Sequence, residues 1–541
     1  MNRLAGLDGM AFDAVVIGGG MAGAGVARDL ALRGASVALF EKGDFSSGTT
    51  SKSSKLIHGG LRYLELGDFK LVRESLREKK TLERLAPHLV RPLPFLVPIY
   101  RGSTRGLIRV RIGMWLYDLL TPGKRTERSR VIRPVDTLAL EPSIRADGLR
   151  GAGYYFDDLL LFPERMCLEN ALSAARHGAR VHNYCQVEEM VRGGRGVEAV
   201  RVRDLLSGQV HTVRGSTIIN CAGPWVDRVR QMGGVAEGAP RILRTTKGIH
   251  CLLPRMTDRA IYLSGEDERM IFVVPWREFT LVGTTDTDFQ GDPDRLWATR
   301  DEVTYLLATT ARALPDPRVA FDRVVYTYAG VRPLSWEEGV PESKVSREHR
   351  VVMEGPEGRF LSVTGTKLTC FRSLAEEVGD LVMARLGRSQ PSRSAALTLD
   401  GSDEEAATLE ARVSMDVSEE MAASGLSRET LEVLVETYGR GYGRVIELAR
   451  KLPDGTERLC PRNPEIVAQL HQAVREEMAV SLQDVLLRRT GIGLSLCQGL
   501  DCAEAVGSRM AELCGWSPRR LDAELAAYRQ HVDRSHRFRT Q

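Results

Sequence analysis

The sequence lacks the features that mark secreted, membrane-spanning and metal-binding proteins. It has no run of about 18 apolar residues, so we expect no segment to cross a bilayer. The nine cysteines are scattered and include no CxxC pair, which argues against a disulfide framework, a zinc site or an iron–sulfur cluster. The N-terminal residues have no separate apolar segment with a cleavage site, so no signal peptide is predicted. These absences indicate a protein of a reducing cytoplasm without a metal site.

An excess of charge of one sign is also missing. Lys and Arg number 75 and Asp and Glu number 71, and the formal charge of +4 is too small for 541 residues to indicate a nucleic-acid-binding protein. Any electrostatic function must therefore be local. The length exceeds that of one hydrophobic core, so we expect two or three packed units.

Residues 14–42, AVVIGGGMAGAGVARDLALRGASVALFEK, predict a strand, a glycine turn, a helix and a second strand. Gly18, Gly20 and Gly23 fit GxGxxG, in which the glycines permit a tight turn, approach to a pyrophosphate and close packing of helix on strand. The helix N-terminus offers free N–H groups to the anion. Glu41, at the end of the second strand, can accept hydrogen bonds from a ribose diol. The segment therefore predicts a dinucleotide site, for FAD or NAD.

Two strand-to-glycine junctions follow downstream. Residues 216–227, STIINCAGPWVD, end a strand-like run at Ala222 and Gly223, and residues 360–377, FLSVTGTKLTCFRSLAEE, turn at Gly365 before a helix. Either junction alone is compatible with an ordinary loop. Three such junctions spread along the chain are what a large dinucleotide held by a discontinuous domain requires, so FAD is favoured over NAD.

Eight segments resemble the FAD-dependent glycerol-3-phosphate dehydrogenases of the aerobic, quinone-linked type, in the same order and at similar spacing from about residue 12 to about residue 530. They are SSKLIHGGLRYLE, CAGPWVD, KGIHCLLPR, FVVPW, GTTDTDFQGDP, YAGVRPL, GTKLTCFRSLAE and EEMAVSLQDVLLRRTGIG. This resemblance is more specific than the glycine fingerprint. Composition and spacing alone lead no further than an FAD-dependent oxidoreductase.

The resemblance implies an α/β plus α fold: a Rossmann-like FAD-binding domain of the amino-acid-oxidase type, an antiparallel-sheet substrate domain and a helical C-terminal domain. The short β-rich segments between residues 242 and 292 suit the antiparallel sheet. The oxidoreductase region is expected at 1–395, with FAD-binding parts at about 1–95, 150–240 and 325–395 and substrate-domain parts at about 96–149 and 241–324. The polar stretch 390–405 then leads to the helical domain at 396–541, where Ser481 and Asp484 form a helix-start signal.

The family pattern also implies which residues contact FAD. In the segment 49–63, the first half is expected to donate to the pyrophosphate and ribityl region, while Gly59 and Gly60 let the chain pass close to the isoalloxazine. Thr366 departs from the family, which usually has glycine there. The full expected set is Gly18, Gly19, Gly20, Gly23, Glu41, Lys42, Thr49, Thr50, Ser53, Ser54, Gly59, Gly60, Ala222, Gly223, Gly365, Thr366, Lys367, Leu368 and Thr369.

Oxidation of glycerol 3-phosphate to dihydroxyacetone phosphate requires cations for the phosphate and a base for the C2 hydroxyl. The resemblance implies that Arg62 and Tyr63 donate to the phosphate and that Arg332 and Lys367 lie beside the substrate. Two histidines are candidates for the base, and we favour His58, with His250 as a substrate-orienting donor. The catalytic set is His58, His250, Arg332 and Lys367, and the substrate-binding set is Arg62, Tyr63, His250, Arg332 and Lys367.

Residues 101–130 carry eight basic side chains against two acidic ones, with an apolar stretch that includes Trp115 between them. A basic amphipathic element of this kind can rest on an anionic leaflet, and a core-packed helix with a solvated basic face is the alternative. The family passes its electrons to a membrane quinone, so the cytoplasmic face of the membrane is the expected location. A homodimer is left open.

Three other functions compete with this interpretation. The nearest is a glycerol-3-phosphate oxidase that reduces oxygen to hydrogen peroxide, but the mid-chain insertion that oxidases carry is missing. The anaerobic type of dehydrogenase is disfavoured because its C-terminal cysteine-rich module is missing. A non-catalytic flavoprotein that binds nucleic acid through residues 101–130 is the third.

Overall fold

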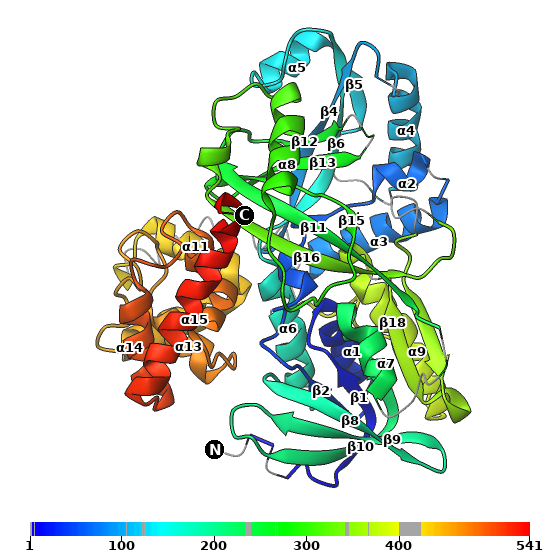
Figure 1. Ribbon diagram of the computed structural model, residues 1–541, viewed down its shortest axis with the longest axis vertical. Helices are drawn as coiled ribbons and strands as arrows, with labels where there is room; N and C mark the ends of the chain where they lie inside the picture. Colours follow the sequence, from blue (N-terminus) through cyan, green and yellow to red (C-terminus); the bar gives the residue numbers. More distant parts are fainter. Residues whose placement is uncertain are drawn as a thin grey trace.

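The protein, described here from a computed structural model, consists of two β-sheet units and a group of C-terminal helices (Figure 1). The structure describes residues 3–540 except 5, 66, 104, 122, 124, 125, 233–237, 239, 266, 268, 341–345, 366 and 400–423. The side chains of Arg62, Glu65 and Pro356 are also outside the described part.

The first sheet has a parallel centre in the order β18-β10-β1-β2-β7, with β17 antiparallel at the edge and a β8–β9 hairpin paired to the start of β10. Its strands are β1 (Ala11–Ile17), β2 (Val37–Phe40), β7 (Arg180–His182), β8 (Cys185–Gly193), β9 (Gly196–Asp204), β10 (Val210–Asn220), β17 (Arg350–Glu354) and β18 (Phe360–Thr364). Helices α1 (Met21–Leu32), α6 (Pro163–Arg176) and α9 (Phe371–Arg385) pack on one face.

Alternation along β1 explains why this sheet is buried on both faces. Ala14 and Val16 lie in the core formed with α1, α6 and α9, whereas Val15 and Ile17 pack with the β8–β9 hairpin. A near-continuous apolar run is typical of a strand covered on both sides. The predicted strand, glycine turn, helix and second strand of residues 14–42 are therefore confirmed, and β2 ends at Phe40, directly before Glu41.

The second sheet is mostly antiparallel, in the order β15-β11-β14-β13-β12-β4-β6-β3, with β16 paired to β11 and β5 to β6; β12 and β4 are parallel. Its strands are β3 (Leu56–Ile57), β4 (Val90–Tyr100), β5 (Arg130–Ile132), β6 (Leu149–Leu160), β11 (Leu243–Pro254), β12 (Ala260–Ser264), β13 (Met270–Trp276), β14 (Phe279–Gly283), β15 (Thr287–Asp288) and β16 (Tyr326–Ser335). The antiparallel arrangement predicted for 242–292 is confirmed. This sheet also takes β3, β6 and β16 from segments that the sequence analysis grouped with the FAD-binding parts.

Some of the remaining helices lie around these sheets, and the others form the C-terminal group at the left of Figure 1. None of the helices within the described residues is long and apolar enough to span a membrane. The remaining helices are α2 (Leu61–Glu65), α3 (Phe69–Leu85), α4 (Leu107–Leu120), α5 (Pro134–Leu140), α7 (Val226–Gln231), α8 (Arg300–Ala313), α11 (Arg428–Tyr438), α12 (Tyr442–Lys451), α13 (Val467–Arg475), α14 (Ala503–Cys514) and α15 (Pro518–His536).

Buried charges join the C-terminal helices to the first sheet. Arg488 and Arg489 lie 2.6 and 2.8 Å from the carboxylate of Asp44, which follows β2. Although burial raises the pKa of Asp44, the two guanidinium groups bring it below its ordinary value. Removing one partner of such a buried pair typically costs about 3–5 kcal/mol.

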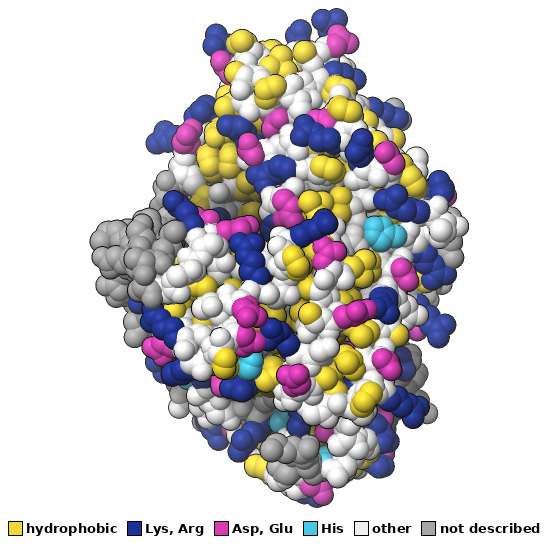
Figure 2. Space-filling view, turned by 90° about the vertical axis from the view of Figure 1, so that its left-hand side faces the viewer, with side chains coloured by type: hydrophobic (Ala, Val, Ile, Leu, Met, Phe, Trp, Pro, Cys, Tyr) yellow, Lys and Arg dark blue, Asp and Glu magenta, His cyan; other side chains and the backbone are white. Residues whose placement is uncertain are grey.

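The side of the molecule that includes these helices carries charges of both signs in a mixed pattern (Figure 2).

The predicted helix start at Ser481 is confirmed. The backbone N–H of Asp484 donates to the Ser481 hydroxyl at 3.2 Å, and the N–H of Ser481 donates back to the Asp484 carboxylate at 3.0 Å. This reciprocal cap satisfies two backbone donors at the start of the turn. The turn then continues through residues 484–489, so the cap places Arg488 and Arg489 toward Asp44.

Candidate active site

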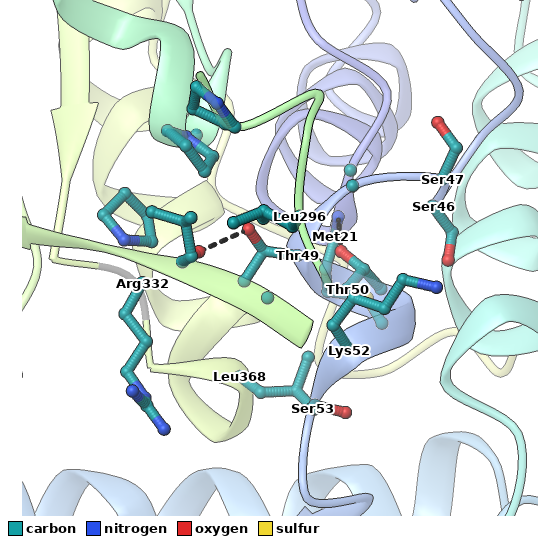
Figure 3. A pocket seen from close by; sticks show the side chains of 18 of the residues that line it. Met21, Ser46, Ser47, Thr49, Thr50, Lys52, Ser53, Leu296, Arg332 and Leu368 are labelled. Carbon is teal, nitrogen blue, oxygen red and sulfur yellow. Dashed lines mark hydrogen bonds between the residues drawn. The ribbon is translucent and has the colours of Figure 1, made fainter. Parts of the chain in front are cut away.

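A cavity of about 1040 Å³ lies between the two sheets and extends to the C-terminal helices. It is lined by the turn before α1, by residues 46–50 and 52–54, by β11 and β16, and by residues of α15. In Figure 3, Ser46, Ser47 and Thr50 lie toward the N-terminus of α1, whereas Arg332 lies on the opposite side of the drawn residues. Hydroxyl side chains therefore lie toward one end of the cavity, and a cationic side chain lies toward the other.

The glycine turn between β1 and α1 forms one end. Gly18 has φ +105°, and a Cβ on it would lie 2.6 Å from the carbonyl oxygen of Cys221. A Cβ on Gly23 would lie 1.9 Å from the carbonyl oxygen of Gly18, so α1 can pack on this turn only with glycine there. No side chain caps α1 at Gly20. The backbone N–H groups at this helix end fit a pyrophosphate.

Glu41 lies at the cavity beside this turn. Its carboxylate oxygens accept hydrogen bonds from the N–H groups of Gly19 at 2.6 Å and Gly43 at 2.8 Å. Burial raises the pKa of Glu41, and the two backbone donors oppose that rise. The side chain is thus held at the end of β2, and its contact with a ribose stays a prediction.

The hydroxyl-rich segment after β2 lies along the cavity. Thr49 donates to the carbonyl of Val331 at 2.7 Å, and Thr50 accepts the N–H of Met21 at 3.0 Å. Lys42 bonds Asp294 at 2.8 Å. The predicted FAD contacts that line the cavity are Gly18, Gly20, Glu41, Lys42, Thr49, Thr50, Ser53, Ser54, Gly60, Ala222, Gly223, Gly365, Lys367 and Leu368.

Four predicted FAD contacts are not among the cavity-lining residues: Gly19, Gly23, Gly59 and Thr369. Gly23 acts through packing, as described above. Gly59 was expected beside the isoalloxazine, but a Cβ there would lie 2.4 Å from the Tyr117 hydroxyl and 2.6 Å from Leu76, so helix packing explains this glycine. Thr366 lies outside the described residues, so its departure from the family pattern stays a prediction.

Two histidines face the other end of the cavity. His250, on β11, stacks on Tyr328 at 4.8 Å between ring centroids, and its Nε2 lies 2.9 Å from the hydroxyl of Ser54. The ring of His58 lies 5.8 Å from that of Phe272. Burial, followed by nearby cations, lowers the pKa of both histidines well below the ordinary value. Both imidazoles are therefore neutral near pH 7, as a proton acceptor must be.

Three cationic side chains converge on these histidines. Arg332, on β16, donates to Thr284 at 2.7 Å and to Asp286 at 3.1 Å, and burial lowers its pKa to about 10, so it stays charged near neutral pH. Arg347 bonds the other oxygen of Asp286 at 2.9 Å. Asp286 therefore links the two guanidinium groups and fixes their spacing.

Lys367 completes this cationic end. Its ammonium donates to the Ser75 hydroxyl at 2.9 Å and to the carbonyl of Gly59 at 3.2 Å, and it lies 4.9 Å from the centre of the Tyr63 ring. The side chains of Tyr63, His58, His250, Arg332 and Lys367, predicted from separate segments, thus line one cavity. The side chain of Arg62 is outside the described part. Partly buried cations beside neutral histidines suit an anionic substrate that gives up a proton.

Arg347 is a cavity residue that the sequence analysis missed. It lies in no recognised segment, and it approaches Arg332 because both bind Asp286. Its sequence neighbourhood, SREHR, resembles a solvated basic stretch. A signal for its role would have required knowledge that the fold brings Asp286 between Arg332 and Arg347.

The fold and the cavity together define a flavin-dependent oxidoreductase, and comparison with known proteins agrees. The family described as FAD dependent oxidoreductase matches residues 13–365, and the C-terminal domain of alpha-glycerophosphate oxidase matches residues 392–521. A glycerol-3-phosphate dehydrogenase of Synechocystis is 36% identical and covers 99% of each chain. An aerobic glycerol-3-phosphate dehydrogenase of Staphylococcus aureus is 33% identical over 97% of this chain and 94% of that protein.

Solved structures give the same result. The glycerol-3-phosphate dehydrogenase of Bacillus halodurans, complexed with FAD, has a TM-score of 0.81, is 27% identical, and covers 98% of this chain and 97% of its own. The L-alpha-glycerophosphate oxidase of Mycoplasma pneumoniae, at a TM-score of 0.56 and 16% identity, covers 71% of this chain and 96% of its own and shares the fold. The chain belongs to the FAD-dependent glycerol-3-phosphate dehydrogenase family, and FAD is its cofactor.

Replacing Gly23 should remove FAD without abolishing the fold. We expect Gly23→Ala to be purified with little flavin, because its Cβ displaces the turn at Gly18 that faces the pyrophosphate. Gly113→Ala is the matched control, since no atom lies within 4 Å of its added Cβ. The measurement is the ratio of flavin to protein absorbance after purification. Equal flavin content in both variants would contradict the assignment of this turn.

Proposed function

We propose that this protein oxidises sn-glycerol 3-phosphate to dihydroxyacetone phosphate and passes the electrons to a membrane quinone. The observation that carries the proposal is the meeting of Arg332, Arg347 and Lys367 with His58 and His250 in the cavity that also holds the glycine turn. A dianionic phosphate compensates the partly buried cations, and a neutral histidine takes the hydroxyl proton. The substrate named for the relatives is the same compound.

The residues divide the work by their chemistry. Lys367, Arg347 and Tyr63, together with Arg62, bind the phosphate as charged or hydroxyl donors. Arg332 lies close to the C2 oxygen, where its charge stabilises developing negative charge. His58 accepts the hydroxyl proton, and His250, oriented by Ser54, holds the substrate alcohol. The FAD of the family supplies the acceptor for the hydride from C2.

Substrate binding strengthens His58 as a base. In the free protein, burial and the charges of Lys367 and Arg347 depress the pKa of this histidine. A bound phosphate dianion offsets those charges, so the pKa of His58 rises toward the value that suits proton transfer. The base is therefore strongest when the substrate is in place.

Helix α4 supports docking on a membrane surface. Its inner side chains Met114 and Tyr117 are buried, whereas Ile108, Ile112, Trp115 and Leu119 are 76%, 55%, 64% and 67% exposed. Their spacing of four, three and four residues places them on one face of the helix. Arg109 and Arg111 are exposed on the same helix. An apolar face with adjacent arginines suits an anionic leaflet.

The location of α4 agrees with this role. Figure 1 shows it at the outer side of the second sheet, away from the C-terminal helices. We propose that the protein docks there as a peripheral protein of the cytoplasmic membrane face, which places it beside its quinone. The alternative of a fully core-packed helix does not account for four exposed large apolar side chains.

The reaction is tested by anaerobic mixing with glycerol 3-phosphate, followed by addition of either a soluble quinone analogue or oxygen. We expect the substrate to bleach the flavin absorbance, because C2 oxidation reduces the cofactor. The quinone analogue should then restore the colour faster than air-saturated buffer does. Fast reoxidation by oxygen with stoichiometric peroxide would establish an oxidase, and no bleaching together with salt-sensitive RNA binding would favour a nucleic-acid-binding flavoprotein.

Membrane docking is tested by co-sedimentation with vesicles that contain an anionic phospholipid. We expect the double variant Trp115→Ala, Leu119→Ala to bind at least about tenfold more weakly, because the apolar area that both side chains bury in the leaflet is lost. Trp336→Ala is the control, since Trp336 is 50% exposed and lies outside α4. Equal sedimentation of the two variants at low salt would remove α4 as the docking element.

A further inference from the structure

Gly59 lies at the junction of the substrate pocket and helix α4. Its carbonyl accepts a hydrogen bond from the Lys367 ammonium at 3.2 Å. Its N–H donates both to the Tyr117 hydroxyl at 2.9 Å and to the Asp157 carboxylate at 3.2 Å. The residue next to it is His58. The backbone of this one residue thus connects a cavity-lining lysine and a candidate base to side chains that lie outside the cavity.

Tyr117 and Asp157 form a rigid, buried support for the backbone of Gly59. They are 2% and 1% exposed, and the Tyr117 hydroxyl donates to Asp157 at 2.6 Å while accepting the Gly59 N–H. Gly59 has no room to shift toward them, because a Cβ on it would already lie 2.4 Å from the Tyr117 oxygen. A buried carboxylate that accepts two donors fixes both of them strongly.

We propose that Tyr117 and Asp157 are positioning residues that hold Gly59 so that its carbonyl aims the Lys367 ammonium at the substrate phosphate. They touch neither substrate nor cofactor and act through the Gly59 peptide. The inference rests on the proposed function, because it assumes that Lys367 binds the phosphate. It also gives the inner face of α4 a role in substrate binding, next to the docking role proposed for its outer face.

The base is held separately from the lysine. The N–H of His58 donates to the Thr369 hydroxyl at 3.2 Å, and that hydroxyl lies 3.3 Å from the His58 carbonyl. Loss of the Tyr117 contact therefore loosens Lys367 more than it displaces His58. The expected signature is a change in KM that exceeds the change in the limiting rate of flavin reduction.

Charge on Asp157 gives a second signature. Burial raises the pKa of Asp157, while Lys79, the Tyr117 hydroxyl, the Gly59 N–H and Lys367 oppose the rise. Tyr155 and Asp158 also face it, and Glu83 acts on Asp158. Removing the Tyr117 hydroxyl raises this pKa further. The charged carboxylate supports Gly59 above its pKa and is lost as the pH falls through it, so the variant loses support at a higher pH than the wild type.

The test compares Tyr117→Phe with Tyr154→Phe by anaerobic stopped-flow reduction of the holoenzyme. Both variants remove one hydroxyl from a buried tyrosine, but Tyr117 accepts the Gly59 N–H, whereas Tyr154, on β6, packs beside Phe156 in a different part of the core. We expect Tyr117→Phe to raise KM for glycerol 3-phosphate about tenfold with a limiting rate within about twofold of the wild type. Its KM relative to wild type should grow further as the pH is lowered. Tyr154→Phe should match the wild type.

A second variant guards against a folding defect. If Tyr117→Phe loses FAD, Asp157→Asn replaces it, since its amide oxygen still accepts both donors but carries no charge. A raised KM at wild-type flavin content supports the inference. Wild-type KM in both variants, or a KM ratio that does not change with pH in Tyr117→Phe, overturns it. Failure of the wild type itself to be reduced by glycerol 3-phosphate is a different result, because it overturns the proposed function.

Discussion

Arg332, Arg347 and Lys367 hold positive charge inside a cavity where burial weakens hydration, and the carboxylate of Asp286 is shared by the two arginines. Burial is strong enough to lower the pKa of Arg332 to about 10, yet the side chain stays charged near neutral pH. Such an arrangement is stabilised by an anionic ligand and has little to offer a neutral one. Burial first, and these charges after it, keep His58 and His250 neutral. The cations that select an anionic substrate therefore also contribute to the neutral state of the candidate base.

The fold brings this charge to the flavin site by joining two sheets of different kind. The parallel strands β1, β10 and β18 all end near the cavity, where the carboxyl ends of such strands leave a crevice for a dinucleotide. The antiparallel pair β11 and β16 supplies His250 and Arg332 from the opposite unit. Asp44, held by Arg488 and Arg489, closes the third side with the C-terminal helices.

Local sequence predicted the parts that depend on local physics. Gly18 and Gly23 are required by backbone conformation and close packing, and β2 follows from a short apolar run, so both could be recognised without a structure. The site residues were found because they lie in four of the eight segments that resemble one family. Arg347 was missed as a pocket residue and Tyr117 as a support of Gly59, because their roles arise from contacts with Asp286 and Gly59, which are distant in sequence. The packing of Gly59 against Tyr117 and Leu76 was missed for the same reason.

The central claim is that His58 is a base whose strength depends on the cations and the bound phosphate. It is tested most directly by the limiting rate of anaerobic flavin reduction at saturating glycerol 3-phosphate, followed across pH in the wild type, in His58→Asn and in His177→Asn as an exposed control. The account predicts that the wild type and the control lose rate as the pH falls through the pKa of His58. It also predicts that His58→Asn is slower by about 100-fold or more and does not lose further rate over that pH range. A His58→Asn variant with the wild-type rate and the same acid limb would contradict it.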